Sequence, residues 1–580
     1  MEEVRTNVSN VLVIGSGAAG LRAAIAAHLA GTEVLVIAKR ARRDAHTSLA
    51  SGGINAALGT RDPEDTWEQH FADTLKEGYF LSDPRVVEIM AREASPAILE
   101  MAEWGCSFAR TREGEIDQRY FGAHKYRRTC YAGDYTGRAL MHCLADKADE
   151  LGIRIADNQY VSRLLVADGQ CFGAVAFDQL TGERTAFLAD AVVLAAGGHT
   201  RVWRRSTSRR DENNGDGMYL ALRAGCRLAD MELVQFHPTG MVAPEEVAGT
   251  LVTEAVRGEG GHLINSEGER FMARYDPERM ELSTRDRVAL ANYTEIMEGR
   301  GGENGGVFLD ISHTGKDFVL ERLPRMYRQF IEYQMLDISK DPMEVAPTAH
   351  YSMGGVVVDP ESHATDVEGL YAIGEVGAGL HGANRLGGNS LTETLVFGRR
   401  AGEAASALSR KLEGQVRSRR VIDEALDDLA GCIHPGNEIV RPVQRALRNA
   451  MWEDCGVVRS EDGLSRGLQK VGELREQLPE IDVRATSEGY GDLAHVLELK
   501  ASLVTAEASL RAALERRETR GCHNRSDYPD LDPALQVNLE VALDGEALQV
   551  TRAPIPAVPD HLLEWGRTAE ELESPGRLLE

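Results

Sequence analysis

The sequence predicts an α/β fold divided into three or four domains. Its 580 residues exceed what one hydrophobic core can hold, since single cores stop growing at roughly 250–300 residues. Near the N-terminus, two apolar strand-like segments flank a glycine-rich turn and an alanine-rich helix. Between about 421 and 519, apolar residues recur at the three- and four-residue spacing of helices. An α/β body followed by a helical bundle accounts for these observations.

The overall charge excludes one class of partner. The chain has 65 Lys+Arg against 91 Asp+Glu, a formal net charge of -26. A surface this acidic repels phosphate backbones, so nucleic acid is not expected as a partner. No stretch approaches the roughly 18 uninterrupted apolar residues of a membrane span, and the N-terminus MEEVRTNVSN lacks the features of a secretion signal. We therefore expect a cytoplasmic protein.

The cysteines indicate no metal centre. No two of them form a CxxC pair, so neither a zinc site nor an iron–sulfur cluster is expected in this chain. We expect all of them to be small buried hydrophobic residues: Cys106, Cys130, Cys143, Cys171, Cys226, Cys432, Cys455 and Cys522. Any cluster needed to carry electrons would therefore belong to another chain.

Residues 10–38 form the pattern of a βαβ unit, with the turn GSGAAG between the first strand and the helix. Gly15 permits the tight turn, Gly17 lets the backbone approach a pyrophosphate, and Gly20 lets helix and strand pack closely. The helix N-terminus then faces the phosphates. A glycine-rich structural turn is the alternative, but this placement favours a dinucleotide site. The expected cradle comprises Gly15, Ser16, Gly17, Ala18, Ala19 and Gly20.

The end of the second strand departs from the usual dinucleotide pattern. An acidic residue that holds the ribose is expected there, but the chain has Ala38, Lys39 and Arg40. This replacement argues against NAD as a simple cosubstrate.

Two later strands end in residues that suit a flavin dinucleotide. The segment AVVLAAGG at 191–198 contains Ala196 and Gly197, whose small size lets the backbone approach a bulky cofactor. The segment GLYAIGE at 369–375 ends in Glu375, whose carboxylate can accept hydrogen bonds from ribityl or ribose hydroxyls. For Glu375 a solvated loop acid is the alternative.

The segment AHTSLASGGINAALG, from Ala45 to Gly59, resembles the flavin-attachment segment of succinate dehydrogenase and fumarate reductase flavoprotein subunits. The resemblance implies a covalent bond between His46 and the 8α-methyl group of FAD, with Gly52 and Gly53 against the isoalloxazine. A lone exposed histidine is the alternative. A covalent bond to the imidazole makes the flavin a stronger oxidant. The resemblance also accounts for Lys39, because members of the family end the second strand with a similar pair of residues. Further cofactor contacts are implied for Thr47, Ser48, Asp216, Arg385, Ser390 and Leu391.

Other motifs extend the resemblance, in the family's order, over most of the chain. They are DYTG (134–137), NNGDG (213–217), FHPTG (236–240), VTEAVRGEGG (252–261), STRD (283–286), HYSMGG (350–355), HGANRLGGNSL (381–391) and RGCHNRSDYP (520–529). L-aspartate oxidase, which shares most of these motifs, is the nearest alternative. It normally lacks the attachment histidine, so His46 and the stretch RYFGAHKYRRTCYAGDYTG argue against it.

Oxidation of a succinate-like dicarboxylate needs a hydride acceptor, clamps for two anions and a base. Within the matched motifs, Arg385 can grip a carboxylate bidentately, because guanidinium geometry favours it. His237, His350 and Thr253 can donate hydrogen bonds to the carboxylates. Taken alone, His237 could be a turn residue and His350 a core residue.

For proton transfer, the resemblance points to Arg285, with Glu254 and Arg257 as a relay toward solvent. An arginine ordinarily has a pKa above 12, so it can act as a base only in a low-dielectric site where loss of its proton is momentary. The alternative is that Arg285 is a structural partner of Asp286.

The resemblance also implies how the domains are arranged. A Rossmann-like FAD-binding domain is expected at 1–230 and 345–420, with an α+β capping domain inserted at 231–344. A helical bundle, in which no chemistry is expected, follows at 421–519, and a small β-containing domain that packs back on the body ends the chain at 520–580. A cap that carries acid–base groups over a flavin suits a site that closes to exclude water.

The implied function is that of a flavoprotein subunit interconverting succinate and fumarate. Electrons would pass to a partner subunit holding iron–sulfur clusters and indirectly to quinone, and membrane-anchor subunits would hold the complex at the inner face of the cell membrane. A flavin-containing subunit without catalysis is a further alternative, but a complete dicarboxylate site argues against it. The direction of the reaction stays open, because Ser51 stands where the family usually carries Gln or Glu.

Overall fold

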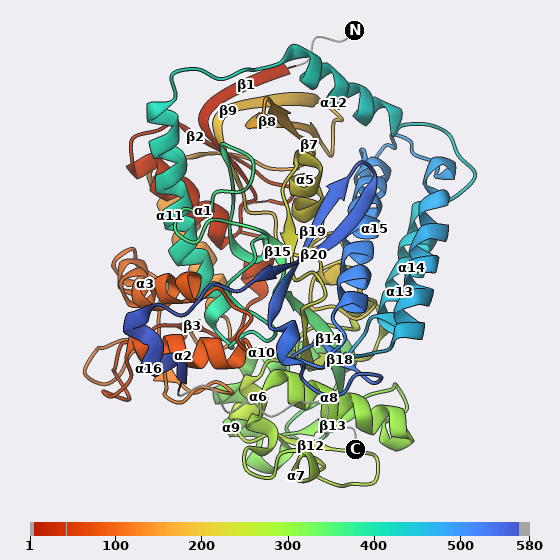
Figure 1. The fold of residues 1–580 in the computed structure, drawn as a ribbon. Coiled ribbons are helices and arrows are strands. Elements are labelled where there is room, and N and C mark those ends of the chain that lie inside the picture. Colours follow the sequence, from red (N-terminus) through yellow and green to blue (C-terminus); the bar gives the residue numbers. More distant parts are fainter. Residues whose placement is uncertain (1–4, 42, 568–580) are drawn as a thin grey trace.

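The computed structural model describes residues 5–41 and 43–567, and within them the centre of the molecule is a seven-stranded sheet (Figure 1). Strand β1 (Arg5–Ile14) pairs in parallel with β2 (Val34–Ile37) and with β9 (Arg184–Leu194). Helix α1 (Ala18–Leu29) connects β1 to β2. The sheet order is β6-β2-β1-β9-β8-β7, and β16 (Leu370–Ala372) pairs with β9. This arrangement confirms the predicted βαβ unit.

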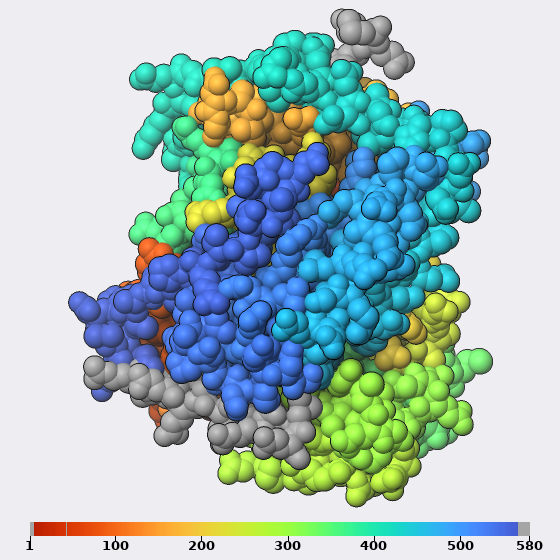
Figure 2. Space-filling model, turned by 45° about the vertical axis from the view of Figure 1, so that its right-hand side comes forward, coloured from red at the N-terminus to blue at the C-terminus, as the bar shows by residue number. Residues whose placement is uncertain are grey.

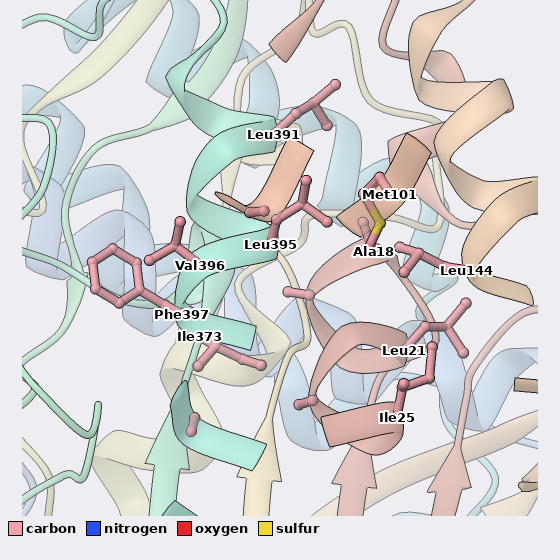
Figure 3. Packing of buried hydrophobic residues seen from close by; sticks show 14 of the residues in the cluster. Ala18, Leu21, Ile25, Met101, Leu144, Ile373, Leu391, Leu395, Val396 and Phe397 are labelled. Atoms are coloured by element: carbon pink, nitrogen blue, oxygen red, sulfur yellow. The ribbon is translucent and has the colours of Figure 1, made fainter. Parts of the chain in front are cut away.

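Helices cover one face of this sheet. Helix α11 (Asn389–Lys411) lies along α1, and Figure 3 shows the Leu395 side chain projecting from α11 toward α1, on the side of Ala18. The same buried cluster includes residues of three more helices. These are α2 (Trp67–Glu77), α3 (Pro84–Glu103) and α4 (Thr136–Glu150).

The remaining strands of the body are short or antiparallel. Strands β7 (Gln159–Ala167) and β8 (Gln170–Asp178) form an antiparallel extension of β9, and β6 (Arg154–Ala156) pairs with β2. A small sheet of order β3-β5-β4 lies apart from the main sheet. Its strands are Ile54–Asn55, Thr129–Cys130 and Gln118–Arg119.

A second unit, at the bottom of Figure 1, is built on an antiparallel sheet of order β11-β14-β13-β12. We call it the cap. Its strands are β11 (Val234–Met241), β12 (His262–Ile264), β13 (Val307–Asp310) and β14 (Met343–Ser352). Its helices are α6 (Ala255–Gly258), α7 (Met272–Tyr275), α8 (Arg285–Glu295), α9 (Lys316–Arg322) and α10 (Pro324–Gln334). The chain enters through β11 and leaves through β14, which pair with each other.

Four helices follow, and they share a buried apolar cluster. They are α12 (Arg419–Gly431), α13 (Val440–Asp454), α14 (Glu461–Glu476) and α15 (Gly491–Glu515). Helix α15 also contacts α5 (Asp216–Ala224) of the body. These helices agree with the helical periodicity of the sequence.

The C-terminal hairpin of β19 (Val537–Asp544) and β20 (Ala547–Pro554) packs back on the body, as the sequence predicts. It pairs with β10 (Leu228–Ala229), which pairs in turn with β15 (Gly355–Val356). In Figure 2 this part of the chain, in dark blue, lies beside the lighter blue helical segment. The outer ends of the first and last predicted domains, residues 1–4 and 568–580, lie outside the described residues.

All eight cysteines are free and buried, which agrees with the expectation from their spacing. Across residues 5–41 and 43–567, no helix combines the length and apolar character needed to cross a membrane. In the same part of the chain, no group of three or more His, Cys, Asp or Glu residues is placed to hold a metal ion.

Glycines allow α11 and α1 to approach closely, and this packing can be tested. A Cβ on Gly402 would lie 2.3 Å from the carbonyl oxygen of Ala23, whereas a Cβ on Gly472, on the exposed face of α14, would meet nothing within 4 Å. We expect Gly402→Ala to lower the free energy of unfolding by about 1–3 kcal/mol, because the helices must separate. Gly472→Ala should raise it by up to about 1 kcal/mol through helix propensity. Chemical denaturation of both variants measures this difference, and equal effects would contradict the packing argument.

Candidate active site

One cavity lies where the carboxyl ends of β1, β2 and β9 face the cap, the usual place for a ligand in a parallel sheet. Most of the residues predicted from the sequence line it. They are Gly15, Ser16, Gly17, Ala18, Ala19, Ala38, Lys39, Arg40, His46, Thr47, Gly52, Gly53, Ala196, Gly197, Asp216, His237, Thr253, Glu254, Arg285, His350, Glu375, Arg385, Ser390 and Leu391. Three predicted residues, Gly20, Ser48 and Arg257, are buried but do not line it.

The glycine-rich turn has the shape of a pyrophosphate cradle. Gly15 has φ +114°, and a Cβ there would lie 2.2 Å from the carbonyl oxygen of Ala195. A Cβ on Gly20 would lie 1.9 Å from the oxygen of Gly15, so Gly20 contributes close packing. Around Gly17 the nearest atom to an added Cβ is 3.4 Å away, so the backbone there is open to a ligand. The start of α1 therefore presents backbone N–H groups toward the cavity.

At the end of β2, Lys39 is part of a partly buried ion cluster. Its Nζ donates to Asp216 Oδ2 at 2.8 Å and to Glu498 Oε1 at 3.0 Å, and Tyr160 donates to Asp216 Oδ1 at 2.8 Å. Burial opposes the charge of Glu498, but Lys39 and His495 outweigh it and lower the pKa of this carboxyl. Glu498 lies on α15, so the helical segment, in which no chemistry is expected, supports this end of the cavity through its contact with Lys39. Local periodicity could not reveal this contact.

Arg40 and Glu375 flank the same cavity. Arg40 Nη2 donates to Asp44 Oδ2 at 2.5 Å, and Nη1 binds Asp211. Glu375 Oε1 accepts the backbone N–H of Ser352 at 3.0 Å. Burial raises the pKa of the Glu375 carboxyl. Because this carboxyl is half-buried and lines the cavity, it is not a solvated loop acid.

The segment predicted to attach the flavin passes along one wall of the cavity. His46 begins a short 3₁₀ turn (His46–Leu49), and its Nδ1 lies 3.4 Å from Glu212 Oε2. Burial lowers the pKa of the His46 imidazole, but Glu212 outweighs it, so the net pKa is raised. A Cβ on Gly52 would meet the Phe121 ring at 2.7 Å. Thr47 Oγ1 accepts the N–H of Ala18 at 3.3 Å, which ties this segment to the phosphate cradle.

At the other end of the cavity, His237 on β11 and His350 on β14 lie with their ring centroids 5.2 Å apart. Thr207 Oγ1 is 3.0 Å from His350 Nδ1, and the N–H of Thr239 donates to His237 Nδ1 at 3.2 Å. Burial and nearby positive groups lower the pKa of both imidazoles well below the ordinary value. Both rings are therefore neutral near pH 7. Thr253, which is also buried, lines the same cavity.

Arg285 and Arg385 approach each other through one shared acceptor. Arg285 Nη1 and Arg385 Nη2 each donate to Gln235 Oε1 at 3.1 Å. Burial and the charge of Arg285 lower the pKa of Arg385 to about 10. Gln235 was not predicted from the sequence, although it directly precedes the FHPTG motif; its amide shows no chemical signal by itself. The pair forms a buried positive site that fits an anion.

Glu254 joins this site to Arg257. Glu254 Oε2 accepts Arg285 Nε at 2.8 Å, and Oε1 accepts the N–H of Gly122 at 2.9 Å. Burial opposes ionisation, but Arg285 and Arg257 outweigh it and lower the pKa of Glu254. Arg257 Nη2 lies 3.8 Å from Glu254, and Nη1 donates to the carbonyl of Glu281.

Two further details of this group follow from the structure. Arg257 lies on α6 and its side chain has 0% exposure, so a relay through this residue needs a further step to reach solvent. The alternative in which Arg285 is a structural partner of Asp286 finds no support, since the guanidinium binds Glu254 and Gln235. The Asp286 carboxylate instead accepts hydrogen bonds from Tyr79 at 2.9 Å and Asn384 at 2.9 Å.

Comparison with known proteins assigns the family. A family described as an FAD binding domain matches residues 10–391, and one described as the C-terminal part of fumarate reductase flavoproteins matches residues 444–555. The chain is 38% identical over 547 residues to the succinate dehydrogenase flavoprotein subunit of Rickettsia bellii, covering 90% of each chain. This chain belongs to the succinate dehydrogenase/fumarate reductase flavoprotein subunits.

Other members of this flavoprotein family extend the comparison. The chain is 45% identical over 525 residues to one subunit of the CoM/CoB fumarate reductase of Methanothermobacter marburgensis, covering 90% of this chain and 95% of the relative. The structure of Mycobacterium smegmatis Sdh1 in complex with UQ1 superposes with a TM-score of 0.88 at 38% identity, covering 97% and 96% of the two chains. These matches confirm the fold class and FAD as the cofactor, whereas the mode of its attachment stays a prediction.

The ion cluster at the nucleotide end makes a pH-dependent prediction. We expect Glu498→Gln to lower the free energy of unfolding by about 1–3 kcal/mol near neutral pH, since a buried charged partner of Lys39 is lost. The pKa of Glu498 is lowered by folding, so its contribution is present above the unfolded pKa of about 4.3 and is lost as pH falls below it. The difference between wild type and variant should therefore shrink toward acidic pH.

Denaturant unfolding of both proteins at neutral and acidic pH measures this difference. Glu473→Gln is the control, because Glu473 pairs with Lys470 on the exposed face of α14 and should change little. A Glu498→Gln effect independent of pH would contradict the ion-cluster argument.

Proposed function

We propose that this flavoprotein subunit interconverts succinate and fumarate. The observation that carries the proposal is the positive site of Arg285 and Arg385, bridged by Gln235, in the cavity whose other end holds the dinucleotide cradle. A dicarboxylate placed there lies next to the predicted position of the flavin ring along residues 46–53. Bound FAD supplies the hydride acceptor for succinate oxidation and the hydride donor for fumarate reduction.

Four side chains are proposed to bind the two carboxylates. Arg385 grips one of them through its guanidinium fork. His237, His350 and Thr253 donate hydrogen bonds, and the lowered pKa values of both histidines keep their rings neutral. Neutral donors hold an anion without adding further charge to a site that already contains two guanidinium groups. Closure of the cap then excludes water from the reacting carbons.

Arg285 is proposed to move the proton. In succinate oxidation the carbon adjacent to the one that gives up the hydride would lose its proton to the Arg285 guanidinium in its transient neutral form. In fumarate reduction the proton travels the opposite way. The ion pair with Glu254 at 2.8 Å gives the proton its next position, and Arg257 lies beyond it. Glu254 and Gln235 hold the Arg285 guanidinium in a fixed orientation for proton transfer.

We also propose that His46 carries FAD covalently. Its Nδ1 faces Glu212, so Nε2 is the nitrogen left for the flavin 8α carbon. The Glu212 carboxylate stabilises positive charge on the substituted imidazole, which keeps the flavin a strong oxidant. The alternative function, an L-aspartate oxidase-like enzyme, would not use this bond.

The proposed electron partners lie on other chains. The sequence contains no CxxC pair for a cluster of its own, and the relatives are named as subunits. We propose that the direct partner is an iron–sulfur subunit, that quinone is the indirect one, and that membrane-anchor subunits hold the cytoplasmic complex at the inner face of the cell membrane. The relationship to a CoM/CoB fumarate reductase makes thiol coenzymes an alternative source of electrons through a similar partner.

The covalent bond predicts that FAD stays with the polypeptide after denaturation in acid or detergent. In-gel flavin fluorescence measures this retention. His46→Ser should release all its FAD and should keep fumarate reduction better than succinate oxidation, because the flavin potential falls. Complete release of FAD from the wild type would contradict the attachment, and the argument against aspartate oxidase would fail with it.

Substitution of the two arginines separates binding from chemistry. Arg385→Ala should mainly raise KM, since loss of a charge-assisted bidentate pair costs about 2–3 kcal/mol. Arg285→Ala should lower kcat far more than it raises KM, because the proton moves in the same transition state as the hydride. Arg285→Lys should recover little activity, since an amine cannot reproduce the guanidinium fork. Steady-state kinetics in both directions measure these effects.

Absorbance of the bound flavin is the control for folding in these variants. A fully loaded Arg285→Ala protein that keeps kcat within about tenfold of wild type, a barrier change of only about 1.4 kcal/mol, would show that Arg285 is not the acid–base group. The role would then pass to Glu254 or to one of the two histidines. Absence of activity with succinate and fumarate in the wild type would reject the proposed substrates.

A further inference from the structure

Arg325 connects the cap to the segment that carries His46. It is the second residue of α10, and its Nη1 donates to Ser51 Oγ at 2.7 Å. Both Nη atoms also lie 3.5 Å from the carbonyl oxygen of Leu49. Ser51 and Leu49 line the cavity, whereas Arg325 does not. The guanidinium therefore lies behind the segment, on the side away from the ligand space.

The rest of α10 is bound to other parts of the cap. Gln329 Nε2 donates to the carbonyl of Leu251 at 3.1 Å, and Gln334 Nε2 donates to the carbonyl of Ala243 at 2.5 Å. At the start of the helix the bonds go to the body instead. The N–H of Arg325 donates to Asp134 Oδ2 at 3.0 Å, and its Nη1 lies 3.3 Å from the carbonyl oxygen of Asp134. Helix α10 thus spans the boundary between cap and body at Arg325.

The contact between Arg325 and Ser51 also sets the orientation of the Ser51 hydroxyl. A guanidinium can only donate hydrogen bonds, so Ser51 Oγ must be the acceptor. The hydroxyl hydrogen of Ser51 is then directed elsewhere, and the carbonyl of Leu49, 3.3 Å away, can accept it. This arrangement therefore depends on the Ser51 hydroxyl.

The guanidinium also brings a positive charge to this wall of the cavity. A second arginine, Arg119, donates from the body to the carbonyls of Ser51, at 3.4 Å, and Gly52. A charge near a flavin ring shifts the reduction potential of the flavin. The reduced ring carries the added electrons, so a nearby cation stabilises it and raises the potential. Arg119 belongs to the body, so its effect on the flavin does not depend on the position of the cap. The positive charge of Arg325 lies at this wall only while the cap is in place.

We propose that Arg325 is a positioning residue that latches the cap to the flavin-attachment segment through Ser51 and raises the reduction potential of the bound flavin. The proposal rests on the proposed function in one respect, that the flavin ring lies along residues 46–53. It makes cap position and flavin potential interdependent. A cap that moves away would withdraw a cation from the flavin and free the segment that holds it.

The test uses the FAD-loaded protein and three variants. Arg325→Met removes the charge and keeps most of the side-chain length, and Ser51→Ala removes the acceptor alone. Arg328→Met is the matched control, because Arg328 is exposed on the same helix. Two measurements are made without any dicarboxylate: redox titration of the flavin, and hydrogen–deuterium exchange of the backbone at residues 49–53 and 324–328.

We expect Arg325→Met to shift the equilibrium toward oxidised flavin by about tenfold, which equals about 30 mV for a two-electron couple, and to speed exchange in both segments. Ser51→Ala should speed exchange similarly with a smaller shift of potential in the same direction, and Arg328→Met should change neither. An unchanged potential and unchanged exchange in Arg325→Met would overturn the proposal. Equal changes in Arg328→Met would overturn it as well.

The same experiments also cover two other results, loss of FAD from a variant and failure of the proposed function. If Arg325→Met does not retain FAD, Ser51→Ala decides, and wild-type exchange in that variant overturns the latch. A failure of the proposed function is separable, because no dicarboxylate is present during either measurement. Even if the protein is inactive on succinate and fumarate, the changes in flavin potential and in backbone exchange can still be measured.

Discussion

The reactive end of the cavity depends on holding positive groups together away from water. Arg285 and Arg385 share the acceptor Gln235 Oε1, and Arg257 lies behind them, against the single carboxylate of Glu254. Arg285 and Arg257 share the one carboxylate of Glu254, while Arg385 donates to the uncharged side chains of Gln235 and Ser390. Buried like charges are costly unless they are compensated. A bound anion would add compensation, and this supports the dicarboxylate substrates proposed above.

The pairing of strands β11 and β14 places two hydrogen-bond donors, His237 and His350, in the cavity that two of these arginines line. His237 on β11 pairs with Thr348 on β14, and the pairing is irregular on both sides of His237, between Gln235 and Phe236 and again before Gly240. Irregular pairing of this kind changes the direction of side chains. It lets His237 and His350, which are not paired across the ladder, both line the cavity. Since β11 and β14 are also the strands through which the chain enters and leaves the cap, these donors lie at the boundary where the cap meets the body.

The sequence predicted the parts of the site that depend on local geometry. Gly15 and Gly20 are required by contacts within one βαβ unit, so their pattern is visible in a short stretch of chain. The approach of His237, Arg285 and Arg385 has no local signature, and only the resemblance to a family predicted it. Gln235 was missed because an amide shows its role only when both guanidinium groups are in place. Glu498 was missed because helical periodicity describes the apolar face of α15, and its partner Lys39 lies far away in the sequence.

The contact between Lys39 and Glu498 changes how the helical segment is understood. Lys39 lines the cavity at the end of β2 and is held there by Asp216 on α5 and by Glu498 on α15. The walls of the cofactor cavity come from the body and the cap, and the helical segment fixes one of them from behind. A ligand that binds only the folded arrangement stabilises every part that shapes its site. Bound FAD would therefore stabilise the packing of α15 against α5 as well as the Rossmann-like sheet, because the helical bundle supports the dinucleotide end through Glu498.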